Sequence, residues 1–216
     1  MTASVVDLGR ADYGPTLELQ RETAARRAKG EIPDTLFLVE HNNVITLGRK
    51  TSPENFRPQN IDVFEVERGG DATYHGPGQL VGYPIFLLTD HDVRRHVVSI
   101  EDALVRAVSK FGITAGKVEG YHGIWAGGKK LGSVGVAVVD WVAFHGFALN
   151  VNTDMSYFSL IRPCGLDPDS MTSMAKVLGR EVDFGEVKGA VAAELAGPSE
   201  IAPISSERGR DPGSVK

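Results

Sequence analysis

Cysteine is almost absent from this chain, because Cys164 is the only one among 216 residues. One thiol cannot form an intramolecular disulfide, and it cannot build a cysteine-rich zinc site. A lone cysteine is more often a small buried apolar residue than a nucleophile. Its role therefore has to be inferred from the residues around it and from the rest of the chain.

Long apolar runs and a strong net charge are also missing. No stretch approaches the roughly 18 apolar residues of a membrane span, and "MTASVVDLGRADYG" lacks the basic and apolar segments of a leader peptide. A net charge of −5 argues against nucleic acid or an anionic membrane as a partner. We expect a cytoplasmic protein whose cysteine stays reduced, which leaves packing or nucleophilic attack.

Metal and nucleotide motifs are incomplete. The six histidines are scattered, with no i,i+4 pair beside a glutamate. "GIWAGGKK" has the spacing of a phosphate-binding loop, but Lys130 stands where a serine or threonine should hold magnesium. "GPGQLVG" has one residue too many for a dinucleotide fingerprint. We predict no metal site and no cofactor.

Hydrophobic periodicity predicts helices and strands in mixed order. Helices are expected over Thr16–Lys29, from an N-cap at Ser99 to Gly112, over about Pro168–Leu178 and over about Phe184–Leu195. The strand-like runs are Thr35–Glu40, Val44–Leu47, "DVFEVER", "GQLVGYPIFLL", "KVEG", "HGIWA", "KLGSVGVAVV" and "WVAFHGFALNV", the last two forming a hairpin near Asp140.

This order lacks regular βαβ alternation. It predicts an α+β fold with mixed, largely antiparallel sheets and flanking helices. Residues 1–200 are expected to form one catalytic domain, and the polar residues 201–216 a disordered C-terminal tail.

Two glycine-rich stretches are candidate pocket walls. "RGGDATYHGPGQLVGYP" (Arg68–Pro84) carries too many glycines for a buried structural strand, and its glycines would let a ligand touch the main chain. In "GKKLGSVGV", glycines again leave room beside a strand that Lys129 and Lys130 begin. The alternatives are an irregular loop for the first stretch and a solvated lysine edge for the second.

Cys164 itself lies in "RPCG". Pro163 and Gly165 place it in a rigid turn, and Arg162 would favour its thiolate form. No cysteine–histidine pair is evident from the sequence.

Together these stretches resemble the lipoyl(octanoyl) transferase family. Its signature is Arg-Gly-Gly-x-x-Thr-aromatic-His-x-x-Gly-Gln-x-aliphatic-x-Tyr, and every fixed position is present here. "KLGSVGV", "FHGFALNVNTD" and "IRPCGL" are similar to the blocks that follow, so the resemblance runs from about Leu36 to Leu178.

The resemblance implies transfer of an octanoyl or lipoyl group from acyl carrier protein to a lysine of apo lipoyl domains, the first step of endogenous lipoate synthesis. The acceptors would be lipoyl domains of 2-oxoacid dehydrogenases and the glycine cleavage H protein. Cys164 would carry the acyl thioester and Lys130 would activate it, as base or as electrostatic stabiliser. The implied fold is that of lipoate-protein ligases and the biotin ligase catalytic domain.

The resemblance and the glycine-rich walls together give the candidate substrate-binding residues. They are Arg68, Gly69, Gly70, Asp71, Ala72, Thr73, Tyr74, His75, Ser133, Val134, Gly135, His145, Gly146, Phe147 and Ala148. An acidic carrier protein would need a local basic patch, for which Arg94, Arg95, Lys129 and Arg162 are candidates. The rival functions are an ATP-dependent lipoate or biotin ligase of the same fold and a non-catalytic acyl-binding module. Chain-length preference and oligomeric state are left open.

Overall fold

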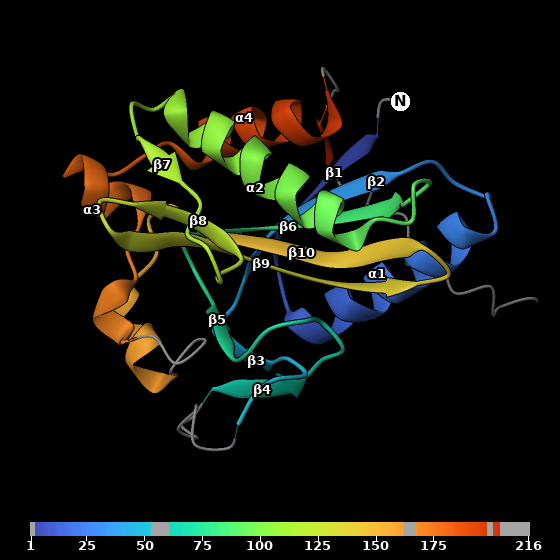
Figure 1. The fold of residues 1–216 in the computed structure, drawn as a ribbon, viewed down its shortest axis with the longest axis horizontal. Helices are drawn as coiled ribbons and strands as arrows, with labels where there is room; N and C mark the ends of the chain where they lie inside the picture. The colour runs from blue at the N-terminus through green and yellow to red at the C-terminus, as the bar shows by residue number, and fades with distance from the viewer. Residues whose placement is uncertain (1–2, 53–60, 162–166, 198–200, 204–216) are drawn as a thin grey trace, which may run out of the picture.

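The computed structural model describes residues 3–52, 61–161, 167–197 and 201–203. Its main body is a mixed sheet of eight strands in the order β11-β1-β2-β6-β10-β9-β8-β7, and a second sheet has the order β4-β3-β5 (Figure 1). The predicted α+β class with mixed sheets is therefore confirmed.

The strands of the large sheet are β1 (Ser4–Ala11), β2 (Thr35–His41), β6 (Gln79–Leu87), β7 (Ala115–Gly116), β8 (Gly123–Ala126), β9 (Lys129–Val139), β10 (Val142–Asn150) and β11 (Ile201–Pro203). Strands β11, β1 and β2 run parallel, whereas every pair from β2 to β7 is antiparallel. β11 falls in the segment predicted to be a disordered tail.

The small sheet consists of β3 (Val44–Leu47), β4 (Asp62–Glu65) and β5 (Thr73–His75). β5 is wholly buried and pairs with β3. The prediction that Arg68–Pro84 holds no buried strand before β6 is thus wrong at these three residues, because their ladder with β3 satisfies the backbone in spite of the neighbouring glycines.

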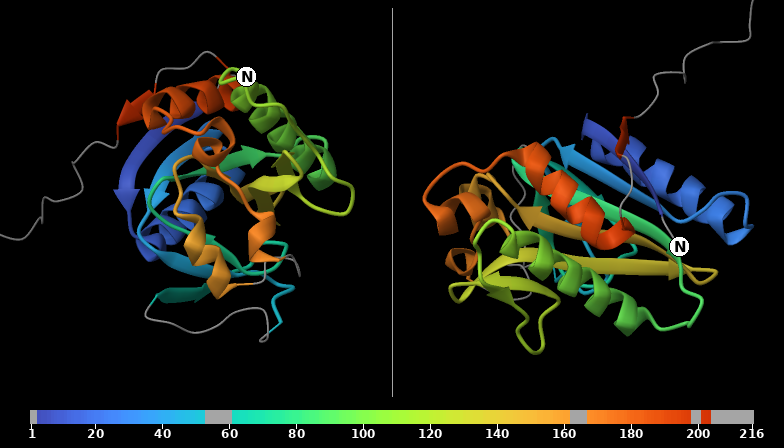
Figure 2. Two further views of the ribbon diagram at one scale, coloured as in Figure 1. Left: turned by 90° about the vertical axis from the view of Figure 1, so that its left-hand side faces the viewer. Right: turned by 90° about the horizontal axis from the view of Figure 1, so that it is seen from above.

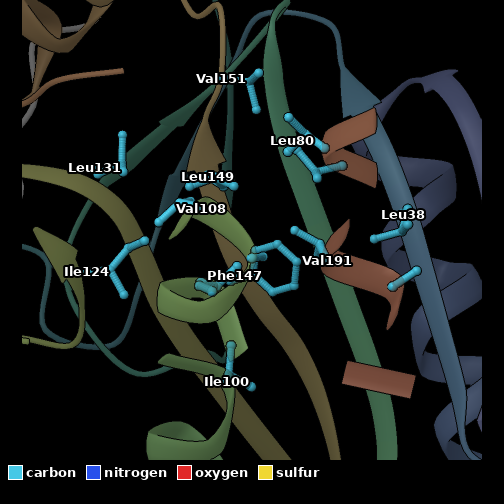
Figure 3. Close-up of a cluster of buried hydrophobic side chains, with 14 of the residues drawn as sticks. Leu38, Leu80, Ile100, Val108, Ile124, Leu131, Phe147, Leu149, Val151 and Val191 are labelled. Carbon is cyan, nitrogen blue, oxygen red and sulfur yellow. The ribbon is translucent and has the colours of Figure 1, made fainter. Parts of the chain in front are cut away.

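Helices cover both faces of the large sheet. The helical segments are α1 (Tyr13–Ala28), α2 (Val93–Ser109), α3 (Met174–Leu178), α4 (Phe184–Ala196) and the 3-10 turns η2 (Met155–Leu160) and η4 (Pro168–Ser170). Figure 2 shows α2 and α4 side by side along one face. Side chains of α2, α4 and the sheet form the largest apolar cluster, drawn in Figure 3. α1 contacts the opposite face along β6 and β10.

Three predicted helices begin elsewhere than expected. α1 begins at Tyr13, three residues before the predicted Thr16. α2 starts at Val93, where the Asp92 side chain accepts the Arg95 N–H, so the predicted N-cap at Ser99 is wrong. Ser99 instead donates to the His96 carbonyl within the helix. The helix expected over 168–178 is divided into η4 and α3, because Ser173 caps α3 anew. "KVEG" follows the short strand β7 and is not itself a strand.

Candidate active site

Backbone hydrogen bonds fix the Arg68–Asp71 loop to β9 on one side and to the turn after β3 on the other. Gly69 donates its N–H to the Val136 carbonyl of β9 at 3.0 Å, and Lys50 donates to the Gly70 carbonyl at 3.0 Å. The loop thus bridges the edge of the small sheet to β9. This close approach also favours glycine at position 135, because a Cβ there would lie 3.0 Å from the Gly69 carbonyl oxygen.

Arg68 is a buried cation, with 8% of its surface exposed. Its Nη2 donates to both the carbonyl oxygen and the hydroxyl oxygen of Thr46 at 2.9 Å, and its Nη1 donates to the Gly69 carbonyl at 3.1 Å. These bonds hold the guanidinium rigidly at the cavity wall, where its charge acts on neighbouring groups with little screening by water.

His75 is held as one neutral tautomer. The Gln79 amide nitrogen donates its two hydrogens to Tyr74 O and Asn150 Oδ1. Its Oε1 therefore accepts the hydrogen bond from His75 Nδ1 at 2.8 Å. His75 Nε2 is then the acceptor, and the Thr46 hydroxyl lies 3.4 Å from it. Burial lowers the His75 pKa from 6.5 to about 3, so the ring is uncharged at neutral pH.

The same chain of bonds reaches the lysine strand. Asn150 Nδ2 donates to the Thr172 carbonyl at 3.0 Å, and the Thr172 N–H donates to the Lys130 carbonyl at 2.9 Å. Three sequence blocks far apart in the chain, around His75, Asn150 and Lys130, are therefore joined by one buried network.

A β-bulge in β9 decides where Lys130 lies. The β8–β9 register pairs Ile124 with Gly132 but Trp125 with Lys130, which leaves Leu131 unpaired. Leu131 joins the core under α2, whereas Lys130 lines the cavity with Ser133 and Gly135. Without the extra residue, the alternation of the strand would reverse the faces of Lys130 and Leu131. Lys130 is 3% exposed.

These elements enclose a cavity of about 610 Å³. It is lined by the predicted residues Arg68, Gly69, Gly70, Asp71, Ala72, Thr73, His75, Lys130, Ser133, Val134, Gly135, His145, Gly146, Phe147 and Ala148. Its volume is within the range of small-molecule sites. Cys164, Arg162 and Pro163 lie outside the described residues.

Tyr74, which was a candidate substrate-binding residue, does not line this cavity. Side chains alternate along β5, so Thr73 and His75 face the cavity while Tyr74 faces the opposite way. Tyr74 stacks on Tyr157, and its hydroxyl donates to Asn43. It is a core residue of the small sheet.

Several lining residues were not predicted. Tyr13 stacks nearly parallel to His75, and Tyr83 donates its hydroxyl to His41 Nε2 at 2.8 Å. The sequence signal for Tyr83 was its place at the end of the glycine-rich signature. The other lining residues missed are Lys50, Val81, Val93, Val97, Gly120, Tyr121, His122 and Val136.

His145 occupies a strained position at the cavity wall. Its φ is 56°, which is uncommon for a residue with a side chain. The adjacent Gly146 lies close against β6, because a side chain there would lie 2.5 Å from Pro84 Cδ. His145 Nε2 is buried without a hydrogen-bond partner among the described residues, 3.7 Å from Glu67. Burial lowers its pKa from 6.5 to about 4.

Within the described ranges, no three His, Cys, Asp or Glu side chains gather in a way that could hold a metal ion. None of the helices in those ranges is long and apolar enough to span a membrane.

Comparison with known proteins identifies the family. Residues 12–196 match the model of the lipoyl protein ligase A/B catalytic domain. An octanoyltransferase of Solibacter usitatus is 47% identical over 83% of this chain and 85% of that protein, and one of Caldicellulosiruptor bescii is 43% identical over 87% of each. The chain spans 58% of the length of an octanoyltransferase from Myxococcus xanthus, at 42% identity over 88% of this chain.

Solved structures agree on the fold. A lipoate-protein ligase A bound with ATP superposes with a TM-score of 0.77 at 18% identity, covering 95% of this chain and 90% of that one. The biotin protein ligase of Aquifex aeolicus gives a TM-score of 0.53 at 13% identity, covering 90% of this chain and 67% of that one. The expected similarity to the fold of the two ligases is confirmed. In sequence identity, the octanoyltransferases are more similar to this chain than either ligase. The chain belongs to the octanoyltransferases, a family of acyltransferases within the lipoyl protein ligase A/B catalytic-domain group.

Proposed function

We propose that this enzyme moves an octanoyl group from acyl carrier protein to a lysine of an apo lipoyl domain, through a thioester on Cys164. The observation that carries the proposal is the position of Lys130, a buried lysine that a β-bulge directs into a cavity of about 610 Å³. The acceptors would be lipoyl domains of 2-oxoacid dehydrogenases and the glycine cleavage H protein, and the compartment the cytoplasm.

The first step exchanges one thioester for another. The Cys164 thiolate attacks the carbonyl carbon of the octanoyl thioester, and the carrier's thiolate leaves and takes up a proton. A free thiol has a pKa near 8.5, so a nearby ammonium or a desolvated amine base is needed to supply the thiolate at neutral pH. Lys130 is the residue we assign to this role.

In the second step, the amine of the acceptor lysine attacks the acyl-enzyme. A C–N bond forms, the C–S bond to Cys164 breaks, and the amine's proton leaves for the thiolate or for Lys130. Conversion of a thioester to an amide is downhill, so the reaction needs no ATP.

The cavity offers matching surfaces for the acyl chain. Val81, Val134 and Phe147 are buried apolar side chains at its wall, and Gly69 and Gly70 bring main chain to its edge. Apolar walls with a few fixed polar groups are the usual composition of a site for a fatty acyl group. We assign the remaining predicted lining residues to substrate binding on this basis.

The test is intact-protein mass spectrometry after incubation with octanoyl-carrier protein. The wild type should gain one octanoyl mass that hydroxylamine removes, and Cys164→Ala should gain none. Lys130→Met should acylate at least about 100-fold more slowly, whereas Lys29→Met, at the exposed end of α1, should match the wild type.

Two outcomes would favour the rival functions. If Cys164→Ala kept substantial octanoylation of a lipoyl domain that depended on ATP, the enzyme would be a ligase. If the wild type bound the acyl group but neither formed the acyl-enzyme nor modified a lipoyl domain, it would be an acyl-binding module.

A further inference from the structure

Glu101 is a buried carboxylate on the apolar face of α2. It is 4% exposed and lies between the core residues Ile100 and Leu104 in the sequence. Burying a carboxylate is costly unless strong hydrogen bonds compensate. It does not cap α2, because Asp92 caps the helix and Glu101 lies more than two turns inside.

The carboxylate binds the start of β8. Glu101 Oε1 accepts the backbone N–H of Gly123 at 2.7 Å, a short distance that is typical of a charge-assisted bond. His122 Nδ1 lies 3.7 Å from the same oxygen. Gly120, Tyr121 and His122, which precede Gly123, form part of the cavity rim. Figure 1 shows β8 beside α2, as this contact requires.

Gly123 is in turn packed against the lysine. Its φ of 131° is accessible only to glycine, and a Cβ there would lie 2.1 Å from the Gly132 carbonyl oxygen and 3.1 Å from Lys130 Cε. The aliphatic stem of Lys130 therefore runs across the bare Cα of Gly123. The backbone of Gly123 thus borders the space that the Lys130 side chain occupies.

We propose that Glu101 is a positioning residue for Lys130. By holding the Gly123 N–H, Glu101 fixes the surface against which Lys130 extends, and it anchors the adjoining rim at the same point. The inference rests on the proposed function, in which Lys130 activates Cys164. Misplacement of a reacting group by about 1 Å can cost on the order of 100-fold in rate, so the bond has a kinetic consequence beyond its contribution to folding.

Three substitutions separate geometry from charge. Glu101→Gln keeps a side-chain oxygen at the same reach, and we expect acylation of Cys164 to stay within about fivefold of the wild type. Glu101→Asp keeps the charge but is one methylene too short, and Glu101→Leu removes the acceptor while matching its apolar neighbours. Both should slow single-turnover acylation by about 10- to 100-fold and should change the KM for octanoyl-carrier protein far less than kcat.

The matched control is Leu104→Ala, one turn further along the same buried face of α2. It should lower the melting temperature at least as much as Glu101→Leu without lowering the acylation rate of the folded enzyme. If Leu104→Ala slowed acylation equally, or if Gln did no better than Asp, the role of Glu101 would be structural and the proposal would be overturned. Should Glu101→Leu fail to fold, the contrast between Gln and Asp still decides.

Failure of the proposed function has a different signature. In that case the wild type forms no acyl-enzyme, or Lys130→Met acylates as fast as the wild type. If instead the wild type forms the acyl-enzyme and Lys130→Met is slow, but Glu101→Leu acylates as fast as the wild type, only the inference about Glu101 fails.

Discussion

His75 donates its Nδ1–H to Oε1 of Gln79 at 2.8 Å, and this one bond orients both side chains. It leaves the Gln79 amide to bridge the Tyr74 carbonyl and Asn150, from which the network continues to Thr172 and Lys130. A buried amide with both ends used has one orientation only, so the glycine-rich loop and the lysine strand are held in a fixed relation.

Replacement of Gln79 should reveal the energy of this junction. Gln79→Met keeps the approximate volume of the side chain. It removes the hydrogen bonds of Gln79 to three buried groups, which are the His75 N–H, the Tyr74 carbonyl and the Asn150 amide oxygen. A buried polar group that loses its hydrogen-bond partner lowers stability by about 1–3 kcal/mol. We therefore expect the free energy of unfolding to fall by about 3 kcal/mol in urea titrations. Asn42→Ala, which removes one exposed bond to Asp12, should change it by less than about 0.5 kcal/mol. Equal effects from the two would mean that the network contributes little.

Acid should destabilise the fold through its buried histidines. Burial lowers the pKa of His41 and His145 from 6.5 to about 4, and that of His75 to about 3. Between these values and 6.5 the unfolded chain binds protons that the folded chain does not, so stability is fully present above pH 6.5 and falls as the pH drops. Each histidine contributes a slope of at most about 1.4 kcal/mol per pH unit.

His145→Asn tests one of these contributions. Asparagine tolerates the positive φ at this position and does not titrate, so the variant's unfolding free energy should decline less steeply than the wild type's from pH 6.5 to 4.5. Urea unfolding at four pH values in this window would measure both slopes. Parallel slopes would show that His145 gains its proton as readily in the folded state as in the unfolded chain.

Local patterns predicted most of the elements, but not the features that depend on partners distant in the sequence. α1, β2, β3 and the hairpin at Asp140 follow from periodicity and turn residues. The start of α2 was missed because Ser99 is a good cap in isolation, whereas the buried residues His96 and Val97 continue the buried face of the helix before it.

The candidate site shows the same division. The glycine-rich signature identified the cavity wall, yet Tyr74 was included because a run of consecutive residues does not reveal which side chains alternate away. The bulge at Leu131 cannot be predicted from β9 alone, because it exists only in the register with β8. In a helix capped at Ser99, Glu101 would lie in the first turn, and only the observed start at Val93 places it deep inside α2.

Two glycine-to-alanine changes should act in opposite directions. A Cβ at Gly146 would lie 2.3 Å from the Gly82 carbonyl oxygen, so the backbone of β10 or β6 would have to shift. We expect Gly146→Ala to lower the unfolding free energy by about 2 kcal/mol or more. Gly189 lies on the exposed side of α4, and no atom lies within 4 Å of where its Cβ would be. Gly189→Ala should therefore raise the unfolding free energy by about 0.5–1 kcal/mol. Thermal and urea unfolding of both variants measure this difference, and a destabilised Gly189→Ala would contradict it.

Charge reversal tests whether the proposed carrier protein docks beside Val93. Val93 lines the cavity at the start of α2, and the exposed Arg94 follows it, while Arg95 is already paired with Asp90 at 3.0 Å. If the acidic carrier protein docks here, Arg94→Glu should raise its KM several-fold at low salt and leave kcat nearly unchanged, because an exposed rim charge acts mainly on association. The difference should shrink as salt is added. Arg26→Glu, at the exposed end of α1, is the control for net charge. Steady-state kinetics with octanoyl-carrier protein at two ionic strengths would compare the two, and an equal rise in KM for both would remove Arg94 from the docking surface.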